Sequence, residues 1–201
     1  STSYFLDKEF IYNPKDFLIM DGGKWQVFRK NCRKFPRRFK EGTLTYDWIN
    51  KLYDKKGTDW VKKELEKLMI SWLNSMGKDT EVSDDEVIIK YLFGGQNRKD
   101  LWTNYGEIFG INIWDYNYCY INYRYCFCKD EDFLSEYLRW LFYTDPIILR
   151  RNYLVNDGGT LGNPNLEKFK MKLNPIYVRD VHSWGRMYGA DEKITHFGRC
   201  P

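Results

Sequence analysis

The chain has 201 residues, of which 43 % are hydrophobic and 18 % aromatic, so it can build a folded core and is not a disordered chain. Its formal net charge of +4 is too small to identify a nucleic-acid-binding protein by itself. The length fits a single domain, and the absence of any run of about 18 apolar residues predicts no membrane-spanning helix.

Five cysteines and two histidines limit the chemistry of the chain. An odd cysteine count, with a start that lacks a basic segment followed by an apolar one, predicts reduced thiols in a cytoplasmic protein. Cys126 and Cys128 would share one face of a strand, but His182 and His196 lie far away in sequence, so we expect no metal. The many lysines, asparagines and tyrosines are typical of an AT-rich coding genome, which suggests a phage gene whose product works in the host cytoplasm.

The first 40 residues combine strand-like and basic segments. Residues 4–20 alternate loosely, which predicts two short strands broken at Asn13-Pro14. Apolar residues at helical spacing predict an amphipathic helix over 24–35 that ends at Pro36. This segment either has a solvated basic face or binds phosphates of a nucleotide cofactor, a transfer RNA or DNA. Its cations are Lys24, Arg29, Lys30, Arg33, Lys34, Arg37 and Arg38.

The next segment is predicted to be helical. Apolar residues recur at three and four positions over 44–76, so we expect a mainly helical insertion at about 44–93. Its last part, 87–93, fits a helix or a strand equally well. The glycine-led basic turn at 94–99 can bind phosphate through backbone amides, but it lacks the spacing of a known phosphate loop.

The strongest strand pattern lies between residues 106 and 128. It predicts a hairpin with a turn at Asp115-Tyr116-Asn117 and a second strand over 118–128. Arg124 would share a strand face with Asn122 and Cys126 because side chains alternate. If buried, this arginine needs an anionic partner, either a carboxylate of the fold or a ligand. A helix over 133–143 follows three acidic residues that complement its positive end.

Residues 153–173 read as a short strand, a glycine-rich turn and a helix that begins at Asn163-Pro164. The turn Asn156-Asp157-Gly158-Gly159 therefore joins a strand to a helix. In open α/β sheets that is a common ligand position, although it can also be a simple tight connection. Residues 176–184 predict a final strand, and the tail 185–201 is expected to be loosely ordered.

From residue 106 on, the predicted order is strand, strand, helix, strand, helix, strand. This order resembles the second half of the GNAT acyltransferase fold, including its relatives of the FemABX and lysyl-phosphatidylglycerol synthase kind. The resemblance rests on the basic helix 24–35, on Tyr120-Ile121-Asn122-Tyr123-Arg124-Tyr125, and on Val155-Asn156-Asp157-Gly158-Gly159 followed by 166–170. It implies an α/β (α+β) fold in a single domain over 1–201, with a GNAT-like mixed, mostly antiparallel sheet flanked by helices.

The sequence departs from the acetyl-CoA-using members of that superfamily at two points. Where they usually have a glycine-rich turn for the pyrophosphate, residues 129–133 contain three acids and no glycine. Phe169 stands near the position where many members place a tyrosine as general acid. The acyl donor is therefore open: an acyl-CoA or an aminoacyl-tRNA is possible, or the cofactor groove has been lost.

The resemblance implies a transferase that delivers an activated acyl or aminoacyl group to an amine, which can belong to a nucleic-acid base as in phage DNA modification. Such a reaction needs a base, an acid and oxyanion donors. The candidate catalytic residues are Asp115, Asp157, Tyr123 and Tyr177. The candidate cofactor-binding residues are Asn156, Gly158, Gly159, Arg124 and Lys170, with the backbone of the two glycines as oxyanion donors.

Two alternatives remain open at this stage. The high aromatic content and the missing pyrophosphate loop favour a non-catalytic phage-type protein that binds nucleic acid or inhibits a host factor. A cysteine hydrolase using Cys126 or Cys128 with His182 has no local sequence signature. The sequence does not predict an oligomeric state.

Overall fold

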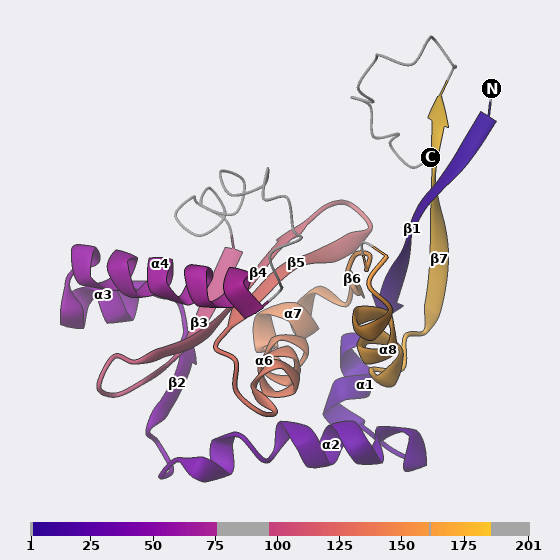
Figure 1. Cartoon of the computed structure of the whole chain (residues 1–201). Coiled ribbons are helices and arrows are strands. Elements are labelled where there is room, and N and C mark those ends of the chain that lie inside the picture. Colours follow the sequence, from indigo (N-terminus) through magenta and orange to yellow (C-terminus); the bar gives the residue numbers. More distant parts are fainter. Residues whose placement is uncertain (1, 76–96, 161, 186–201) are drawn as a thin grey trace.

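One seven-stranded sheet organises the chain in the computed structural model, which describes residues 2–75, 97–160 and 162–185 (Figure 1). The strand order is β2-β3-β4-β5-β6-β1-β7. Within the described ranges every pairing is antiparallel except that of β5 with β6. This confirms the predicted mixed, mostly antiparallel sheet. The strands are β1 Thr2–Tyr12, β2 Leu44–Asp47, β3 Asn97–Thr103, β4 Ile108–Tyr116, β5 Tyr120–Cys128, β6 Leu154–Asn156 and β7 Tyr177–Gly185.

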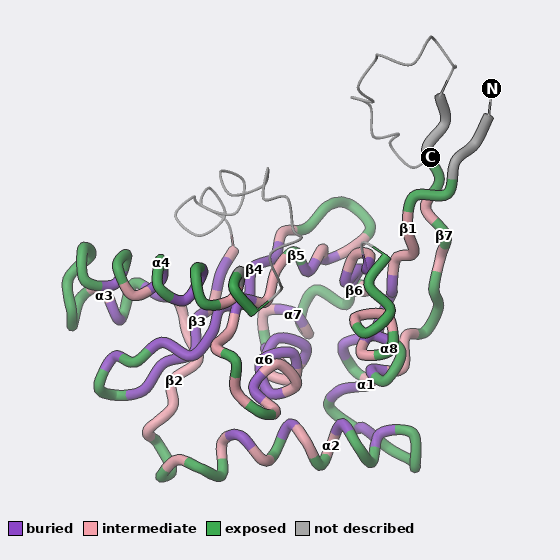
Figure 2. The backbone as a smooth tube through the Cα atoms, viewed as in Figure 1, coloured by how far each residue is buried: buried purple, intermediate pink, exposed green. Residues whose placement is uncertain are grey.

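Helices pack on both faces of the sheet. The face that we call the α6 face is covered by α1 Pro14–Ile19, α2 Gln26–Cys32, α6 Leu134–Tyr143, α7 Pro146–Arg151 and α8 Pro164–Lys172, with short turns η1 Gly23–Trp25 and η2 Pro36–Arg38. The opposite face, the α4 face, is covered by α3 Asn50–Lys56 and α4 Thr58–Ser75. Figure 2 shows the central strands buried while the outer turns of α4 are exposed.

The buried strand β4 explains why both faces carry helices. Residues 108–114 are all buried, as expected for a central strand covered on both sides. A side chain at Gly110 would place its Cβ 2.4 Å from Leu138 Cδ1 and 2.9 Å from the Phe127 carbonyl oxygen. The glycine therefore allows α6 to approach the sheet closely.

The hairpin of β4 and β5 contains a β-bulge that the sequence pattern did not reveal. Ile113 pairs with Tyr125 and Trp114 pairs with Tyr123, so Arg124 is the extra residue. The bulge reverses the alternation of side chains along β5. Tyr123 therefore packs on the α6 face and Tyr125 on the α4 face. Cys126 lies on the α6 face. The prediction that Cys126 shares a strand face with Asn122 is therefore wrong.

Two short segments differ from their predicted secondary structure. Asn13-Pro14 does not break two strands but begins α1, since the Asn13 side chain accepts a hydrogen bond from the Lys15 amide and Pro14 takes the first helical position. Residues 44–47 form strand β2, paired with β3, rather than helix. Both segments are too short for a periodic pattern to identify.

Other predictions about the middle of the chain need adjustment. Asp115 lies within β4 rather than in a turn, and Asn97–Lys99 of the predicted phosphate turn belong to β3. Residues 94–96, the ambiguous segment 87–93 and the tail from 186 lie outside the described residues. The insertion at 44–93 stays a prediction, although β2 at its start is a strand of the sheet.

The N-terminal strand β1 lies between β6 and β7 and pairs with both. Only its end pairs with β6, through Ile11 and Tyr12, whereas its pairing with β7 begins at Thr2. The outer parts of β1 and β7 therefore form a two-stranded ribbon that extends beyond the rest of the sheet (Figure 1).

Candidate functional site

The sheet opens between β5 and β6. These strands pair in parallel over three positions, Tyr120 with Leu154, Ile121 with Val155 and Asn122 with Asn156. Beyond Asn156 the chain turns away at Asp157, while β5 continues to Cys128. Ligands of open α/β sheets often bind at the carboxyl ends of strands where neighbouring strands diverge. We refer to this position as the β5–β6 opening.

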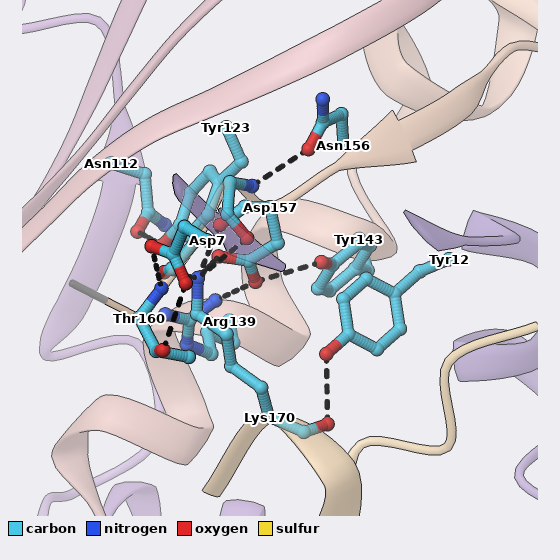
Figure 3. A network of polar contacts seen from close by, with 12 residues as sticks. Asp7, Tyr12, Asn112, Tyr123, Arg139, Tyr143, Asn156, Asp157, Thr160 and Lys170 are labelled. Atoms are coloured by element: carbon cyan, nitrogen blue, oxygen red, sulfur yellow. Dashed lines mark hydrogen bonds and ion pairs between the residues drawn. The ribbon is translucent and has the colours of Figure 1, made fainter. Parts of the chain in front are cut away.

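A buried charge network fills the opening (Figure 3). Asp157 is only 5 % exposed. Its carboxylate accepts a hydrogen bond from the Arg139 guanidinium and one of 3.1 Å from the Tyr143 hydroxyl, and lies 3.3 Å from the Lys170 ammonium. Three elements, α6, α8 and the turn after β6, therefore meet at one carboxylate.

Lys170 fixes the turn after β6. Its ammonium donates to the backbone carbonyls of Asp157, Gly158 and Gly159, the last at 2.7 Å. Burial lowers the pKa of Lys170 and Arg139 lowers it further, while Asp157 opposes both effects. A cation with three carbonyl partners and a carboxylate is well satisfied, so Lys170 holds this turn in place.

The glycine turn itself is tightly packed against β1. The Gly158 amide donates to the Asn156 side chain at 2.8 Å, so it is already used. The amide and hydroxyl of Thr160 both donate to the Asp7 carboxylate. A Cβ at Gly159 would lie 2.0 Å from that carboxylate and 3.0 Å from the Lys8 carbonyl oxygen. Gly159 is therefore required by close packing.

Arg139 is the central residue that the sequence pattern did not identify. Its guanidinium lies 5.0 Å from the ring centre of Tyr123 and 5.2 Å from that of Phe169, within range of cation–π attraction. Burial is the largest single effect and lowers its pKa, but Asp157, together with Tyr123, Cys126 and Tyr143, outweighs burial, so the pKa of Arg139 is raised. Among the described residues its Nε has no hydrogen-bond partner. In the sequence, the feature that could have pointed to Arg139 was a single arginine within the predicted apolar helix 133–143.

Tyr123 belongs to a second chain of hydrogen bonds on the same face. Its hydroxyl donates to the Asn112 side chain, which in turn donates to the Leu138 carbonyl at 2.8 Å and to Tyr46 at 2.9 Å. Burial raises the pKa of Tyr123, so this phenol stays protonated at neutral pH.

The other two candidate catalytic residues lie elsewhere. Asp115 neighbours Trp114, which packs on the α6 face, so Asp115 points to the α4 face. There it pairs with Arg124 Nε at 2.7 Å and accepts a 2.7 Å hydrogen bond from Asn122. Tyr177 lies on β7, with its hydroxyl 2.6 Å from that of Tyr120. The opening thus combines Tyr123 and Asp157, but not Asp115 or Tyr177.

The predicted basic segment forms α2 and η2, which lie outside α6. Arg29, Lys30, Arg33, Lys34 and Arg37, with Gln26, line an open depression of about 350 Å³. Arg38 pairs with Glu131 at 3.4 Å, whereas the five lining cations form no salt bridge within the described part of the chain. Lys24 precedes α2 in η1. This surface carries a concentrated, unneutralised positive charge.

Two other chemistries find no support in the described residues. Across residues 2–75, 97–160 and 162–185, no three histidine, cysteine or acidic side chains gather into a metal-binding group. The sheet order puts His182 on β7, three strands from Cys126 on β5, roughly 14 Å at the usual strand spacing. The predicted pairing of Cys126 or Cys128 with His182 is therefore excluded. No helix in the described ranges is long and apolar enough to cross a membrane.

Comparisons with known proteins identify the fold. No family model and no curated protein sequence matches the chain. A conserved protein of unknown function from Bacteroides thetaiotaomicron has a similar structure, with a TM-score of 0.70 at 16 % identity. So does L-PGS from Bacillus licheniformis, with a TM-score of 0.61 at 18 % identity.

A third similar structure is the C-terminal domain (DUF2156) of a putative lysylphosphatidylglycerol synthetase from Agrobacterium fabrum, with a TM-score of 0.59 at 13 % identity. In each case the match covers 90 % of this chain and 60 % of the other, so this chain spans less than two thirds of their length. At such identities the likeness concerns the fold, and it agrees with the GNAT-like sheet predicted from the sequence.

Proposed function

We propose that this chain is a GNAT-like acyl- or aminoacyl-transferase that delivers an activated acyl group to an amine. The observation that carries the proposal is the charge network at the β5–β6 opening, in a fold similar to domains named for lysylphosphatidylglycerol synthetase and L-PGS. Arg139 contributes a buried N–H group that no described residue uses. A reacting carbonyl oxygen is a natural acceptor for such a donor.

The proposed reaction is aminolysis of an ester or thioester. The acceptor nitrogen attacks the acyl carbon, loses a proton to a base, and the alcohol or thiol of the donor leaves with a proton. Asp157 is the candidate base and Tyr123 the candidate acid on the α6 face. Arg139 and the Gly159 amide are the candidate oxyanion donors, because the Gly158 amide already binds Asn156. Asp115 and Tyr177 would contribute only to an acceptor site on the other side of the sheet.

An aminoacyl-tRNA is the donor that we favour over an acyl-CoA. The segment before α6 carries Asp130, Glu131 and Asp132, which would repel a pyrophosphate there. The unneutralised cations of α2 and η2 instead offer several phosphate contacts along one surface. The name of one similar structure, a putative lysylphosphatidylglycerol synthetase, refers to an aminoacylated lipid, which fits a charged tRNA as donor. A nucleic-acid base as the acceptor stays a prediction.

The test is transfer of labelled amino acids from a mixture of aminoacyl-tRNAs to an alkali-stable product. Ester-linked label is released by mild alkali, whereas an amide survives. We expect transfer by the wild type and loss of at least 100-fold in Arg139→Lys, which keeps the charge but lacks the guanidinium Nε. Glu107→Gln, which removes a surface ion pair with Lys129, is the matched control. Absence of transfer from both aminoacyl-tRNAs and acyl-CoAs would contradict the proposal.

A second candidate is nucleic-acid binding without catalysis, which the basic surface of α2 and η2 favours. Native mass spectrometry of protein purified from its host separates the two. A retained nucleic acid, with no transfer by the wild type, would favour a binding protein over a transferase.

A further inference from the structure

Two depressions adjoin on the outer side of α2 and α6. The first is the basic depression described above. The second, of about 340 Å³, shares Arg33 and Arg37 with it and is otherwise lined by apolar and aromatic side chains. These are Cys32, Pro36, Tyr137 and Trp140. A cationic surface and an aromatic pocket therefore meet at the same two arginines.

The aromatic wall of the second pocket is built by α6. Tyr137 and Trp140 are three residues apart, so they lie on one helical face, and their rings stack with centres 6.0 Å apart at 22°. Phe35, which is fully buried, supports Tyr137 from the core at a ring distance of 5.7 Å. Trp140 is half-buried, so part of its indole borders the pocket. The wall is fixed by packing before any ligand binds.

The two arginines are free to bind an anion. Arg33 and Arg37 are exposed and form no salt bridge within the described ranges. Acids near them are already engaged, since Glu136 accepts a hydrogen bond from Asn31 and Glu131 pairs with Arg38. Arginine binds phosphate through two parallel N–H groups, so two of them beside one pocket favour a phosphate-bearing ligand.

The aromatic wall suits a flat ring and the two arginines suit a phosphate, and a nucleotide carries both groups. Bases stack on aromatic side chains in a sequence-tolerant way, and cationic grooves follow the attached phosphates. Building on the transferase function above, we propose that this pocket binds a nucleotide of the acyl carrier. The base lies against Trp140 and Tyr137, and the phosphate lies on Arg33 and Arg37. The nucleotide belongs either to an RNA end or to the 3′-phosphoadenosine part of a CoA.

Binding of three probes to the full chain tests the site without any transfer reaction. The probes are a fluorescent single-stranded RNA ending in CCA, CoA, and adenosine 3′,5′-bisphosphate, measured by anisotropy or calorimetry at fixed salt. We expect the wild type to bind at least one of them. Binding of RNA alone would identify an RNA end, and binding of CoA and the bisphosphate alone would identify a CoA-type carrier.

Four variants test whether the probes bind at the pocket between α2 and α6. Trp140→Leu is expected to weaken binding about tenfold, and Trp140→Phe to restore most of it, because a ring can stack and an alkyl chain cannot. The double variant Arg33→Ala/Arg37→Ala is expected to weaken binding at least tenfold and to reduce its salt dependence. Lys62→Ala/Lys63→Ala removes the same charge from the exposed surface of α4 and is expected to have little effect.

Several results would contradict the proposed nucleotide site. One is binding that depends on the arginines but not on Trp140, which would leave only a basic surface. Others are no binding of any probe by a wild type with a normal thermal transition, or equal weakening by the α4 variant. If binding follows the expected pattern but no transfer is detected, the proposed function fails while the nucleotide site stands.

Discussion

Asp157 is the carboxylate on which the buried charges of the β5–β6 opening depend. Asp157→Asn leaves Arg139 and Lys170 inside the protein with a neutral partner. Loss of one member of a buried ion pair commonly costs about 3–5 kcal/mol, because the remaining charge stays desolvated. We expect a drop of about 3 kcal/mol in the free energy of unfolding, measured by urea denaturation.

The same substitution at Asp115 is the matched comparison. Its pair with Arg124 is partly solvated, and exposed ion pairs contribute at most about 1 kcal/mol. Asp115→Asn should therefore change stability by less than about 1 kcal/mol. Equal losses in the two variants would contradict the view that Asp157, unlike Asp115, neutralises a buried network.

A second buried acid makes stability depend on pH. Asp100 on β3 is fully buried, with Arg98 Nε 3.3 Å from one oxygen, and neither oxygen has a hydrogen-bond partner among the described residues. Burial raises its pKa to about 7, although Arg98 opposes the shift. In the unfolded chain an aspartate loses its proton near pH 4, at about 3.9. Between these values the folded state binds more protons, so stability falls as pH rises from about 4 to about 7.

The expected result is a lower urea midpoint at pH 8 than at pH 5 in the wild type. Asp100→Asn removes the titrating group and should flatten this decline, whereas the exposed control Asp54→Asn should keep it. A steeper decline in Asp100→Asn than in the wild type would show that other groups control the pH dependence.

Two residues of the site were predictable because a glycine-rich turn marked their surroundings. The glycine-rich turn drew attention to Asp157, and the helix after it to Lys170, and the structure places the two side chains together. Arg139 was missed because a charged residue in an apolar helix usually lies on the solvent side. Asp115 was assigned to the same chemistry because the sequence placed it in a turn after a strand, whereas it lies within β4 and points to the α4 face.

At the scale of single elements, the N-terminal cap of α8 can be tested by substitution. The Asn163 side chain accepts hydrogen bonds from the amides of Asn165 and Leu166. Asn163→Ala should lower the free energy of unfolding by about 1 kcal/mol, as for other N-cap replacements. Asn165→Ala, two residues on and inside the helix, is the control and should be neutral or slightly stabilising. A larger loss in the control would mean that the cap does not stabilise α8.

Elements with several turns or several alternating residues were predictable, whereas the short elements α1 and β2 were not. The hairpin, α6 and α8 extend over nine or ten residues each, long enough for their periods to appear. Helix α1 has six residues, fewer than two helical turns, and β2 has four, too few for its alternation to stand out within a helical pattern. The strand β2 exists because β3 supplies its hydrogen-bond partners, which is a long-range contact absent from the local sequence.

At the scale of the whole molecule, the sheet depends on contacts between the two ends of the chain. β1 joins β6 to β7, so residues about 170 apart in sequence pair directly, as Glu9 does with Arg179. Such pairings cannot be read from periodicity, and the position of β1 inside the sheet was not predicted. Their loop-closure cost also makes folding slow compared with that of a helical protein of the same size.

Two truncations test this dependence. Removing residues 2–5 takes away only pairings with β7 at the outer end of the ribbon, where Phe5 is 55 % exposed. We expect a cooperative thermal transition lowered by a few degrees, since little apolar area is lost. Removing 2–12 also deletes Phe10, Ile11 and Tyr12, all fully buried, and separates β6 from β7. That chain should show no cooperative transition by circular dichroism. Cooperative melting of the longer truncation would mean that β7 can pair with β6 directly, and that β1 does not hold the sheet together.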